Sequence, residues 1–371
     1  MRVAILLEQM LAPVPGGTGR YSAEVATALA ETAPRGAAVT GWTAWHRRTG
    51  AARLPGVAGP RRLALPRRPL AAAWERGRGP RPRGADVVHA PTLLVPPAGD
   101  RPLVVTVHDA VPWTHPETLT PRGARWHRAM AERAAATAAA VVVPTAAVAD
   151  ELGRVLPLRR PPVVVGLGVS GRLAEPADAD DRARRLGLPG GPFLLTLATL
   201  EPRKGLDVLL AALARPEAPD VPLLLAGAPG WGGVDPVRSA AEAGLPAGRV
   251  RHLGRLGDDD LATVLRRATA LVAPSRAEGF GLPVLEAMAA GTPVVSSDAP
   301  ALAEVGGGAT LTTPVGDPAA LAAALGRVVD DAGLRAQLAA AGRRRSGAYS
   351  WSAAARTLWD LYRTLPGLNR W

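Results

Sequence analysis

The chain has 371 residues, enough for two domains of ordinary size that each bury a hydrophobic core. A hydrophobic fraction of 47% and a mean hydropathy of +0.08 exclude a disordered polypeptide. No apolar stretch approaches the roughly 18 residues of a membrane span, and the run at residues 3–7 stops at Glu8, too early for a secretory signal. Without cysteine, disulfides and thiolate chemistry are excluded, so we expect a protein of the reducing cytoplasm.

The net charge of +12 is concentrated in one segment. Eleven arginines lie between Arg47 and Arg83 against a single acid, Glu75, so this Arg-rich segment carries +10 of the total. Such a concentration favours an anionic partner, either acidic lipid headgroups or a nucleic acid. The alternative is a solvated, partly flexible Arg/Pro loop.

Short apolar runs alternate with helical patterns along the whole chain. In the first half, strands are predicted over 2–7, 37–44, 86–90, 103–108, 140–143 and 163–165, and helices over 21–31, 122–139 and 146–155. In the second half, strands are predicted over 193–197, 223–226, 250–253, 270–273 and 293–296, and helices over 207–214, 261–268 and 284–290. This order indicates an α/β protein with two doubly wound, Rossmann-like parallel sheets.

These elements predict two domains, at residues 1–170 and 192–349. The stretch 171–191 is rich in Gly, Pro and acidic residues without a strand pattern, and we expect it to be a linker. Residues 350–371 form an amphipathic helix whose aromatic side chains need a surface, for which the N-terminal domain is the natural candidate. Because ligands bind outside the carboxyl ends of the strands in such sheets, two facing sheets predict an interdomain cleft as the site.

The most specific motif follows the predicted strand at 270–273 and reads PSRAEGFGLPVLEAM over residues 274–288. Its glycines allow a ligand to approach the backbone closely, and a helix that starts near Pro283 presents N–H groups suited to an anion. Glu278 in the turn and Glu286 in the helix can face one crevice and hold sugar hydroxyls. The alternative for two such glutamates is a helix cap and a solvated side chain.

This motif resembles the signature of the retaining glycosyltransferases of the GT-B fold, in the family 4-like, mannosyltransferase-like group. Their hallmark is two glutamates separated by seven residues, with Gly-Phe-Gly-Leu-Pro after the first. The resemblance implies that Glu278 contacts the donor sugar near the reacting carbon and that Glu286 holds the donor ribose. It also implies donor binding by Gly279, Phe280, Gly281 and Leu282. The likeness continues over residues 289–295 and 301–305 and covers nearly the entire chain except the Arg-rich segment.

A second motif, TLEPRKGLD at residues 199–207, follows the strand at 193–197. Adjacent cations at a strand end before a helix suit a diphosphate, and they stabilise the charge that a departing diphosphate develops. Lys204 is the only lysine of the chain. The resemblance assigns Lys204 to catalysis and donor binding and Arg203 to donor binding. Many relatives carry a further Arg at the position of Ala198, for which Arg203 is the available substitute.

Two weaker motifs follow strands of the first half. The turn that contains Gly16 and Gly17 leads into a helix, and the resemblance places this glycine pair over the donor phosphates, beside the acceptor. His108 ends the strand at 103–108. A lone histidine is more often structural, but the resemblance places it near the transferred sugar, and we interpret it as a positioning hydrogen-bond donor rather than a general base.

Two stretches, Asp178-Ala179-Asp180 and Asp258-Asp259-Asp260, have the D-x-D spacing of metal-dependent glycosyltransferases. The first lies in the predicted linker, and the second precedes the helix at 261–268, where acidic residues favour the positive helix end. We therefore expect no metal and no cofactor, since Arg203, Lys204 and a helix N-terminus can neutralise the donor.

The resemblance thus implies a retaining, metal-independent hexosyltransferase that uses a nucleoside-diphosphate sugar, either GDP-mannose or a UDP-sugar. The acceptor class stays open among a glycan, a lipid-linked and a small-molecule acceptor. The Arg-rich segment predicts contact with an anionic surface at the inner face of the membrane. One alternative is a nucleotide-sugar epimerase of the same fold. The other is a basic nucleic-acid-binding protein, which the Pro-rich spacing and the single aromatic Trp74 disfavour.

Overall fold

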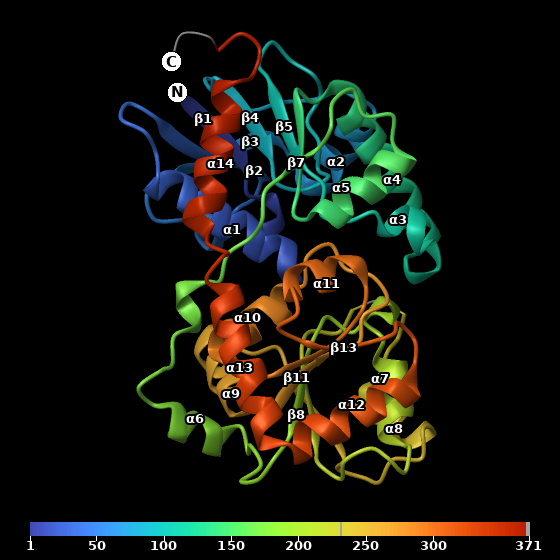
Figure 1. Ribbon diagram of the computed structural model, residues 1–371. Helices are drawn as coiled ribbons and strands as arrows, with labels where there is room; N and C mark the ends of the chain where they lie inside the picture. Colours follow the sequence, from blue (N-terminus) through green and yellow to red (C-terminus); the bar gives the residue numbers. More distant parts are fainter. Residues whose placement is uncertain (231, 369–371) are drawn as a thin grey trace. The chain divides into compact units, whose positions relative to one another are not determined.

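The computed structural model describes residues 1–230 and 232–368 (Figure 1). Residues 369–371 of the predicted C-terminal segment therefore lie outside the described part of the chain. Internal contacts divide the chain into two compact units. The first comprises Met1–Gly168 and Tyr349–Trp371, and the second comprises Val169–Ala348.

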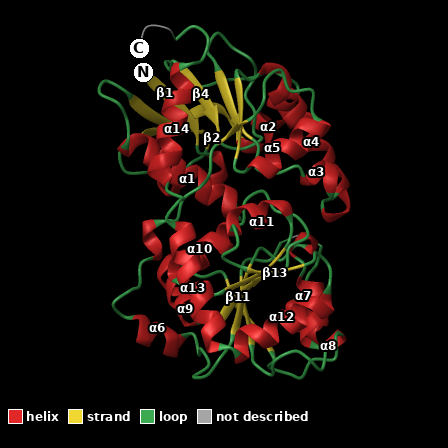
Figure 2. Ribbon diagram, in the orientation of Figure 1, coloured by secondary structure: helices red, strands yellow, loops and turns green. Residues whose placement is uncertain are grey.

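The first unit is built on a seven-stranded parallel sheet of order β3-β2-β1-β4-β5-β6-β7, with helices on both faces (Figure 2). Its strands are β1 (Arg2–Leu6), β2 (Ala38–Trp45), β3 (Ala58–Pro66), β4 (Val87–Ala90), β5 (Leu103–Thr106), β6 (Ala140–Val143) and β7 (Val163–Val164). Its helices are α1 (Gly16–Glu31), α2 (Arg67–Glu75), α3 (Val111–Thr114), α4 (Pro121–Thr137), α5 (Ala146–Val155) and α14 (Trp351–Arg363).

The second unit is built on a six-stranded parallel sheet of order β10-β9-β8-β11-β12-β13. Its strands are β8 (Leu194–Leu197), β9 (Leu223–Ala226), β10 (Val250–Gly254), β11 (Ala270–Ala273), β12 (Val294–Ser297) and β13 (Leu311–Thr313). Its helices are α6 (Ala179–Arg185), α7 (Leu206–Leu213), α8 (Pro236–Glu242), α9 (Asp258–Arg267), α10 (Leu282–Ala290), α11 (Pro300–Gly306), α12 (Pro318–Asp330) and α13 (Ala332–Ser346). Helices α9, α10 and α13 flank one face of the sheet, and α7, α8 and α12 flank the other (Figure 2).

Local sequence explains how these elements begin and why the central strands are apolar. Strands β4, β5 and β9 are buried along their whole length because helices cover both faces of each sheet. Aspartate side chains accept hydrogen bonds from the first turns of α8, α12 and α13, at Asp235, Asp317 and Asp331 respectively. Each cap satisfies backbone donors that the helix itself leaves unpaired.

The C-terminal helix α14 packs against α1 within the first unit. Its aromatic side chains Trp351, Trp359 and Tyr362 are buried, and the indole nitrogen of Trp359 donates to the carbonyl of Leu29 at 3.1 Å. The exposed apolar stripe predicted for residues 350–363 is therefore covered by the first 168 residues of the chain.

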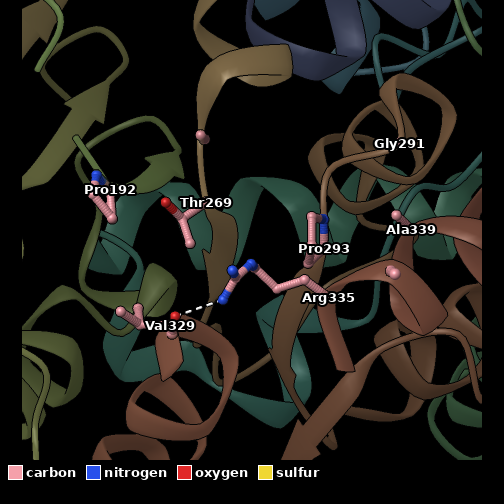
Figure 3. A pocket seen from close by; sticks show the side chains of 9 residues that line it. Pro192, Thr269, Gly291, Pro293, Val329, Arg335 and Ala339 are labelled. Atoms are coloured by element: carbon pink, nitrogen blue, oxygen red, sulfur yellow. Dashed lines mark hydrogen bonds between the residues drawn. The ribbon is translucent and has the colours of Figure 1, made fainter. Parts of the chain in front are cut away.

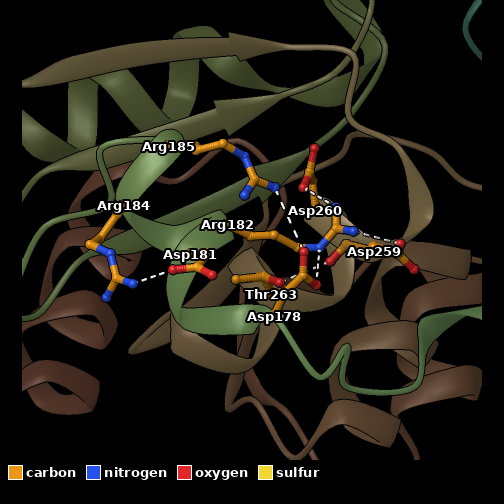
Figure 4. Close-up of polar contacts among 8 residues, drawn as sticks. All are labelled: Asp178, Asp181, Arg182, Arg184, Arg185, Asp259, Asp260 and Thr263. Carbon is orange, nitrogen blue, oxygen red and sulfur yellow. Dashed lines mark hydrogen bonds and ion pairs between the residues drawn. The ribbon is translucent and has the colours of Figure 1, made fainter.

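The segment 171–191 differs from the linker that its composition predicted. It contains α6, which packs on α9 and belongs to the second unit. Arg182 of α6 donates to Asp178 at 2.7 Å, and to Asp259 at 2.9 Å and Asp260 at 2.7 Å of α9 (Figure 4). The aspartates of the predicted linker are thus paired with arginines, Asp178 with Arg182, Asp180 with Arg267 and Asp181 with Arg184.

The Arg-rich segment is ordered, although its sequence predicted neither a strand nor a helix. It forms the edge strand β3 and helix α2, so the alternative of a partly flexible loop is wrong for this part of it. Trp74, the single aromatic residue of this segment, does not reach the surface. Its side chain is fully buried between elements of the core, and its indole nitrogen donates to the carbonyl of Pro80 at 2.9 Å. Leu63 and Leu70 anchor the same segment in the core.

Candidate active site

The second sheet reverses its winding between β8 and β11, which lie side by side in the parallel sheet. Strands β9 and β10 follow on one side of this point, and β12 and β13 follow on the other. In doubly wound sheets, the loops at the carboxyl ends of the two central strands leave a crevice at such a switch point, and ligands bind there. The loop after β8 carries Arg203 and Lys204, and the loop after β11 carries Glu278.

Backbone contacts hold these two loops against each other. The amide of Arg276 donates to the carbonyl of Arg203 at 2.8 Å, and the Arg276 guanidinium donates to the carbonyl of Pro202 at 2.9 Å. The same guanidinium pairs with Asp207 at 2.5 Å. Gly205 has φ +68°, and a Cβ there would lie 2.2 Å from the carbonyl oxygen of Pro274, so no other residue fits this approach.

Within this frame, Glu278 receives both cations of the second motif. Lys204 Nζ donates to Glu278 Oε1 at 2.6 Å, and Arg203 Nη1 donates to Glu278 Oε2 at 2.9 Å. Arg203 also donates to the carbonyl of Ala277 at 2.6 Å and lies 3.6 Å from the carboxylate of Glu201. The structure therefore brings the adjacent predicted site residues Arg203 and Lys204 together with Glu278, which lies more than 70 positions further along the sequence.

This cluster is largely removed from water, because the side chains of Glu278, Arg203 and Lys204 are only 12%, 15% and 17% exposed. Burial alone would raise the pKa of Glu278, but the positive charges of Lys204 and Arg203 outweigh it and lower that pKa to about 2. Burial and the neighbouring Arg203 lower the pKa of Lys204, against the attraction of Glu278. We take the pair to be ionised at neutral pH, since each charge stabilises the other.

Two serines that sequence reasoning missed position this carboxylate. Ser275 Oγ donates to Glu278 Oε1 at 2.8 Å, and Ser297 Oγ at the end of β12 donates to the carbonyl of Ser275 at 2.6 Å. Both serines are buried. Their position at strand ends was a signal in the sequence, but serine is too common there to be selected without the pairing of β11 with β12.

The remaining donor-binding candidates lie at the start of α10. Gly281 precedes the helix with φ +93°, Leu282 is its first residue, and Pro283 follows. Glu286 lies further along α10 and is 6% exposed. Gly279 and Phe280 lie in the turn that joins Glu278 to the helix. Ala198 stands where many relatives carry a further arginine, and its carbonyl lies close against Gly227. The second cation beside Glu278 is Arg203.

In the first unit, the winding reverses between β1 and β4. Gly16 and Gly17 open α1 after β1, so this helix begins five residues before the predicted start at Tyr21. His108 follows β5, and its Nε2 lies 2.8 Å from the carbonyl oxygen of Pro91. Because a carbonyl only accepts, Nε2 carries the ring proton, and burial lowers the pKa of His108 so that the ring is neutral. The other nitrogen, Nδ1, is then an acceptor, in contrast to the expected hydrogen-bond donor.

A buried polar network lies beneath His108. His89 of β4 contacts the Tyr362 hydroxyl of α14 at 2.6 Å and Thr106 Oγ1 of β5 at 2.9 Å. Thr106 Oγ1 lies 3.1 Å from the Tyr21 hydroxyl of α1, and the ring of Tyr21 meets His108 edge-on at 4.7 Å. Burial lowers the pKa of His89 to about 3, so it stays neutral. The network joins β4, β5, α1 and α14 of the first unit, and it contacts His108 through the ring of Tyr21.

The aspartate clusters pair with arginines rather than with one another. Among residues 1–230 and 232–368, no group of three or more His, Cys, Asp and Glu side chains is placed to hold a metal ion. A pocket of about 330 Å³ lies at the opposite, amino-terminal edge of the second sheet, where Pro192, Thr269 and Pro293 precede β8, β11 and β12 (Figure 3). Arg335 in that pocket donates to the carbonyls of Val328 and Val329 at 3.1 and 2.5 Å.

Comparison with known proteins relates both units to one class of enzyme. Residues 15–170 match the family described as Glycosyltransferase Family 4, and residues 178–345 match the family described as Glycosyl transferases group 1. A phosphatidyl-myo-inositol mannosyltransferase of Mycolicibacterium smegmatis is 41% identical over 172 residues, which are 45% of this chain and 43% of that protein. The chain spans about half the length of the curated relatives it matches.

Solved structures resemble the chain over almost its whole length. Sucrose-phosphate synthase from Thermosynechococcus elongatus has a TM-score of 0.73 and 24% identity, and 98% of each chain is covered. HepE from Anabaena, in complex with UDP and glucose, has a TM-score of 0.75 and 20% identity, with 98% of this chain and 100% of that chain covered. The two parallel sheets are therefore the two Rossmann-like domains of a GT-B fold. The chain belongs to the family 4 glycosyltransferases of this fold.

Proposed function

We propose that the protein transfers a sugar from a nucleoside-diphosphate sugar to an acceptor hydroxyl, with retention of configuration and without a metal. The observation that carries the proposal is the cluster of Lys204, Arg203 and Glu278 at the switch point between β8 and β11. A pair of fixed cations suits the diphosphate, and a carboxylate beside it suits the hydroxyls of the sugar.

The chemistry follows from where charge develops. The bond between the anomeric carbon and the β-phosphate oxygen breaks, and negative charge grows on the departing diphosphate. Lys204 and Arg203 stabilise that charge from a backbone that is already in place, because Gly205 and Arg276 hold their loop against the loop of Glu278. These fixed charges supply the neutralisation that a metal ion provides in metal-dependent enzymes.

In the proposed reaction, the acceptor oxygen attacks the anomeric carbon from the face that the diphosphate leaves. The departing phosphate oxygen takes the acceptor proton, so the products are a glycoside of unchanged anomeric configuration and a nucleoside diphosphate. Glu286 holds the donor ribose, and the glycine turn at Gly16 and Gly17 lies over the donor phosphates. His108 accepts a hydrogen bond from a sugar hydroxyl at Nδ1.

Relatives support two donor classes. The mycobacterial relative is named a mannosyltransferase, which supports GDP-mannose, and HepE is solved with UDP and glucose, which supports a UDP-sugar. A thermal-shift panel of GDP-mannose, UDP-glucose, UDP-N-acetylglucosamine and ATP tests the proposal, since a bound donor raises the melting temperature by mass action. We expect one nucleotide sugar to stabilise the protein, with turnover that persists in excess EDTA. No shift with any nucleotide sugar, or activity that EDTA abolishes and Mn²⁺ restores, contradicts it.

The Arg-rich segment supports an acceptor held at an anionic surface. Arg48, Arg53, Arg62 and Arg68 are exposed around the edge strand β3 and the start of α2. The relative in Mycolicibacterium smegmatis carries phosphatidyl-myo-inositol in its name, which supports a lipid-linked acceptor. Among the described residues, no helix has the length and apolar character to cross a membrane. We therefore propose peripheral, charge-dependent attachment to the inner membrane face.

A further inference from the structure

The cationic pair of the donor site already has an anionic partner within the chain. Lys204 and Arg203 both contact the carboxylate of Glu278, at 2.6 and 2.9 Å, and Glu201 lies 3.6 Å from Arg203. These four side chains together carry no net charge. All four are more than two-thirds buried, so the attraction between them is screened by water far less than at the surface.

A diphosphate cannot simply be added to this arrangement. Its negative charge would lie beside Glu278 in a poorly solvated place, where repulsion between like charges is strong. The cations must therefore exchange one anion for another. We infer that Glu278 is the counter-ion of Lys204 and Arg203 before the donor binds, and that the donor's diphosphate displaces it from these two cations. The inference rests on the proposed function and deepens it by assigning Glu278 two successive partners.

The serine contacts show how the carboxylate keeps its place during this exchange. Ser275 holds Glu278 Oε1 at 2.8 Å, and Ser297 fixes the backbone of Ser275 at 2.6 Å, so neither contact depends on the cations. Once Lys204 and Arg203 turn to the diphosphate, Glu278 remains anchored at one oxygen and offers its freed lone pairs to sugar hydroxyls. Ser275 is then a positioning residue, and the carboxylate engages the sugar only when the diphosphate is bound.

The exchange predicts effects of opposite sign in one variant. In Glu278→Gln the cations lose their internal anion, so UDP or GDP binds without competition. We expect nucleoside diphosphate affinity to rise about tenfold, equivalent to about 1.4 kcal/mol, while turnover of the nucleotide sugar falls. Damage to the site would lower both. Glu217→Gln is the matched control, because Glu217 pairs with Arg215 at an exposed position of the same unit and its loss should leave affinity unchanged.

Isothermal titration of the full chain with UDP and GDP measures these affinities. Unchanged or weaker binding by Glu278→Gln overturns the exchange, whereas failure of the wild type to bind either nucleotide overturns the proposed function itself. Should Glu278→Gln not fold, Glu201→Gln tests the exchange instead. We expect its affinity for the nucleoside diphosphate to rise two- to threefold, and an unchanged affinity would overturn the exchange. Ser275→Ala should lower kcat without loss of nucleotide affinity. A loss of both in that variant contradicts the positioning role.

Discussion

At the scale of single residues, the ionisation of Glu278 links the candidate site to the stability of the protein. Its pKa is lowered from 4.5 to about 2, because Lys204 and Arg203 outweigh the effect of burial. A lowered carboxyl pKa stabilises the fold above pH 4.5, and this contribution disappears as the pH falls towards 2. We expect the melting temperature of the wild type to exceed that of Glu278→Gln at pH 7.

The difference between these two proteins should shrink steadily as the pH is lowered from 4.5 towards 3. Differential scanning calorimetry at several pH values measures it, with Glu217→Gln as the control for loss of a surface carboxylate. A difference that stays constant over this range would show that Glu278 is not held ionised by the two cations.

The sequence selected three candidate site residues that the structure brings together, but it did not predict their contacts. Motif spacing selected Lys204, Arg203 and Glu278, and the observed pairing of β8 with β11 explains why distant motifs meet. The motif spacing could not show that Glu278 forms ion pairs with both cations, because these contacts depend on the packing of Gly205 against Pro274. It also could not assign the tautomer of His108, which the carbonyl of Pro91 determines.

At the scale of elements, the strands with continuous apolar runs were predicted closely. Those over 140–143, 223–226 and 270–273 have the observed bounds of β6, β9 and β11. Strand β3 was missed because an edge strand lacks burial on both faces, and its run of Pro60, Arg61 and Arg62 resembles a loop. Helix α2 was missed because Pro66, Pro69 and the neighbouring arginines obscure the buried pair Leu70 and Trp74.

Helix α14 contributes a hydrogen bond that ties the end of the chain to the core of the first unit. Tyr362→Phe removes the hydroxyl that lies 2.6 Å from His89 Nδ1 and leaves a buried ring nitrogen without that partner. Loss of such a partner costs about 1–3 kcal/mol. We expect urea denaturation to show this loss in the free energy of unfolding, whereas Thr357→Val, at an exposed position of the same helix, changes it little. Equal stability of Tyr362→Phe and wild type would contradict the role of the network.

At the scale of the whole molecule, the concentration of arginines in one segment predicts attachment to an anionic membrane surface. Each arginine near an anionic membrane contributes about 1 kcal/mol, and the effect decays within a Debye length of roughly 8 Å. We expect the wild type to co-sediment with vesicles that contain phosphatidylglycerol at low salt and to be released at high salt. Changing the exposed Arg48, Arg53, Arg62 and Arg68 to Ser should abolish this binding.

The matched control changes Arg122, Arg125, Arg159 and Arg160 to Ser, which removes the same charge from exposed positions of the same unit outside the Arg-rich segment. This control should still co-sediment. If the wild type stays in the supernatant with anionic vesicles, or if both variants lose binding equally, the segment has no specific role in membrane attachment.

The central claim is that Lys204 stabilises a departing nucleoside diphosphate. Release of GDP or UDP from the donor that the thermal-shift panel selects tests it most directly, with wild type, Lys204→Ala and the surface control Arg238→Ala compared under identical conditions. Loss of about 3 kcal/mol of transition-state stabilisation predicts a rate roughly a hundredfold lower for Lys204→Ala, and the control should retain the wild-type rate. Release by Lys204→Ala at the wild-type rate would contradict the account.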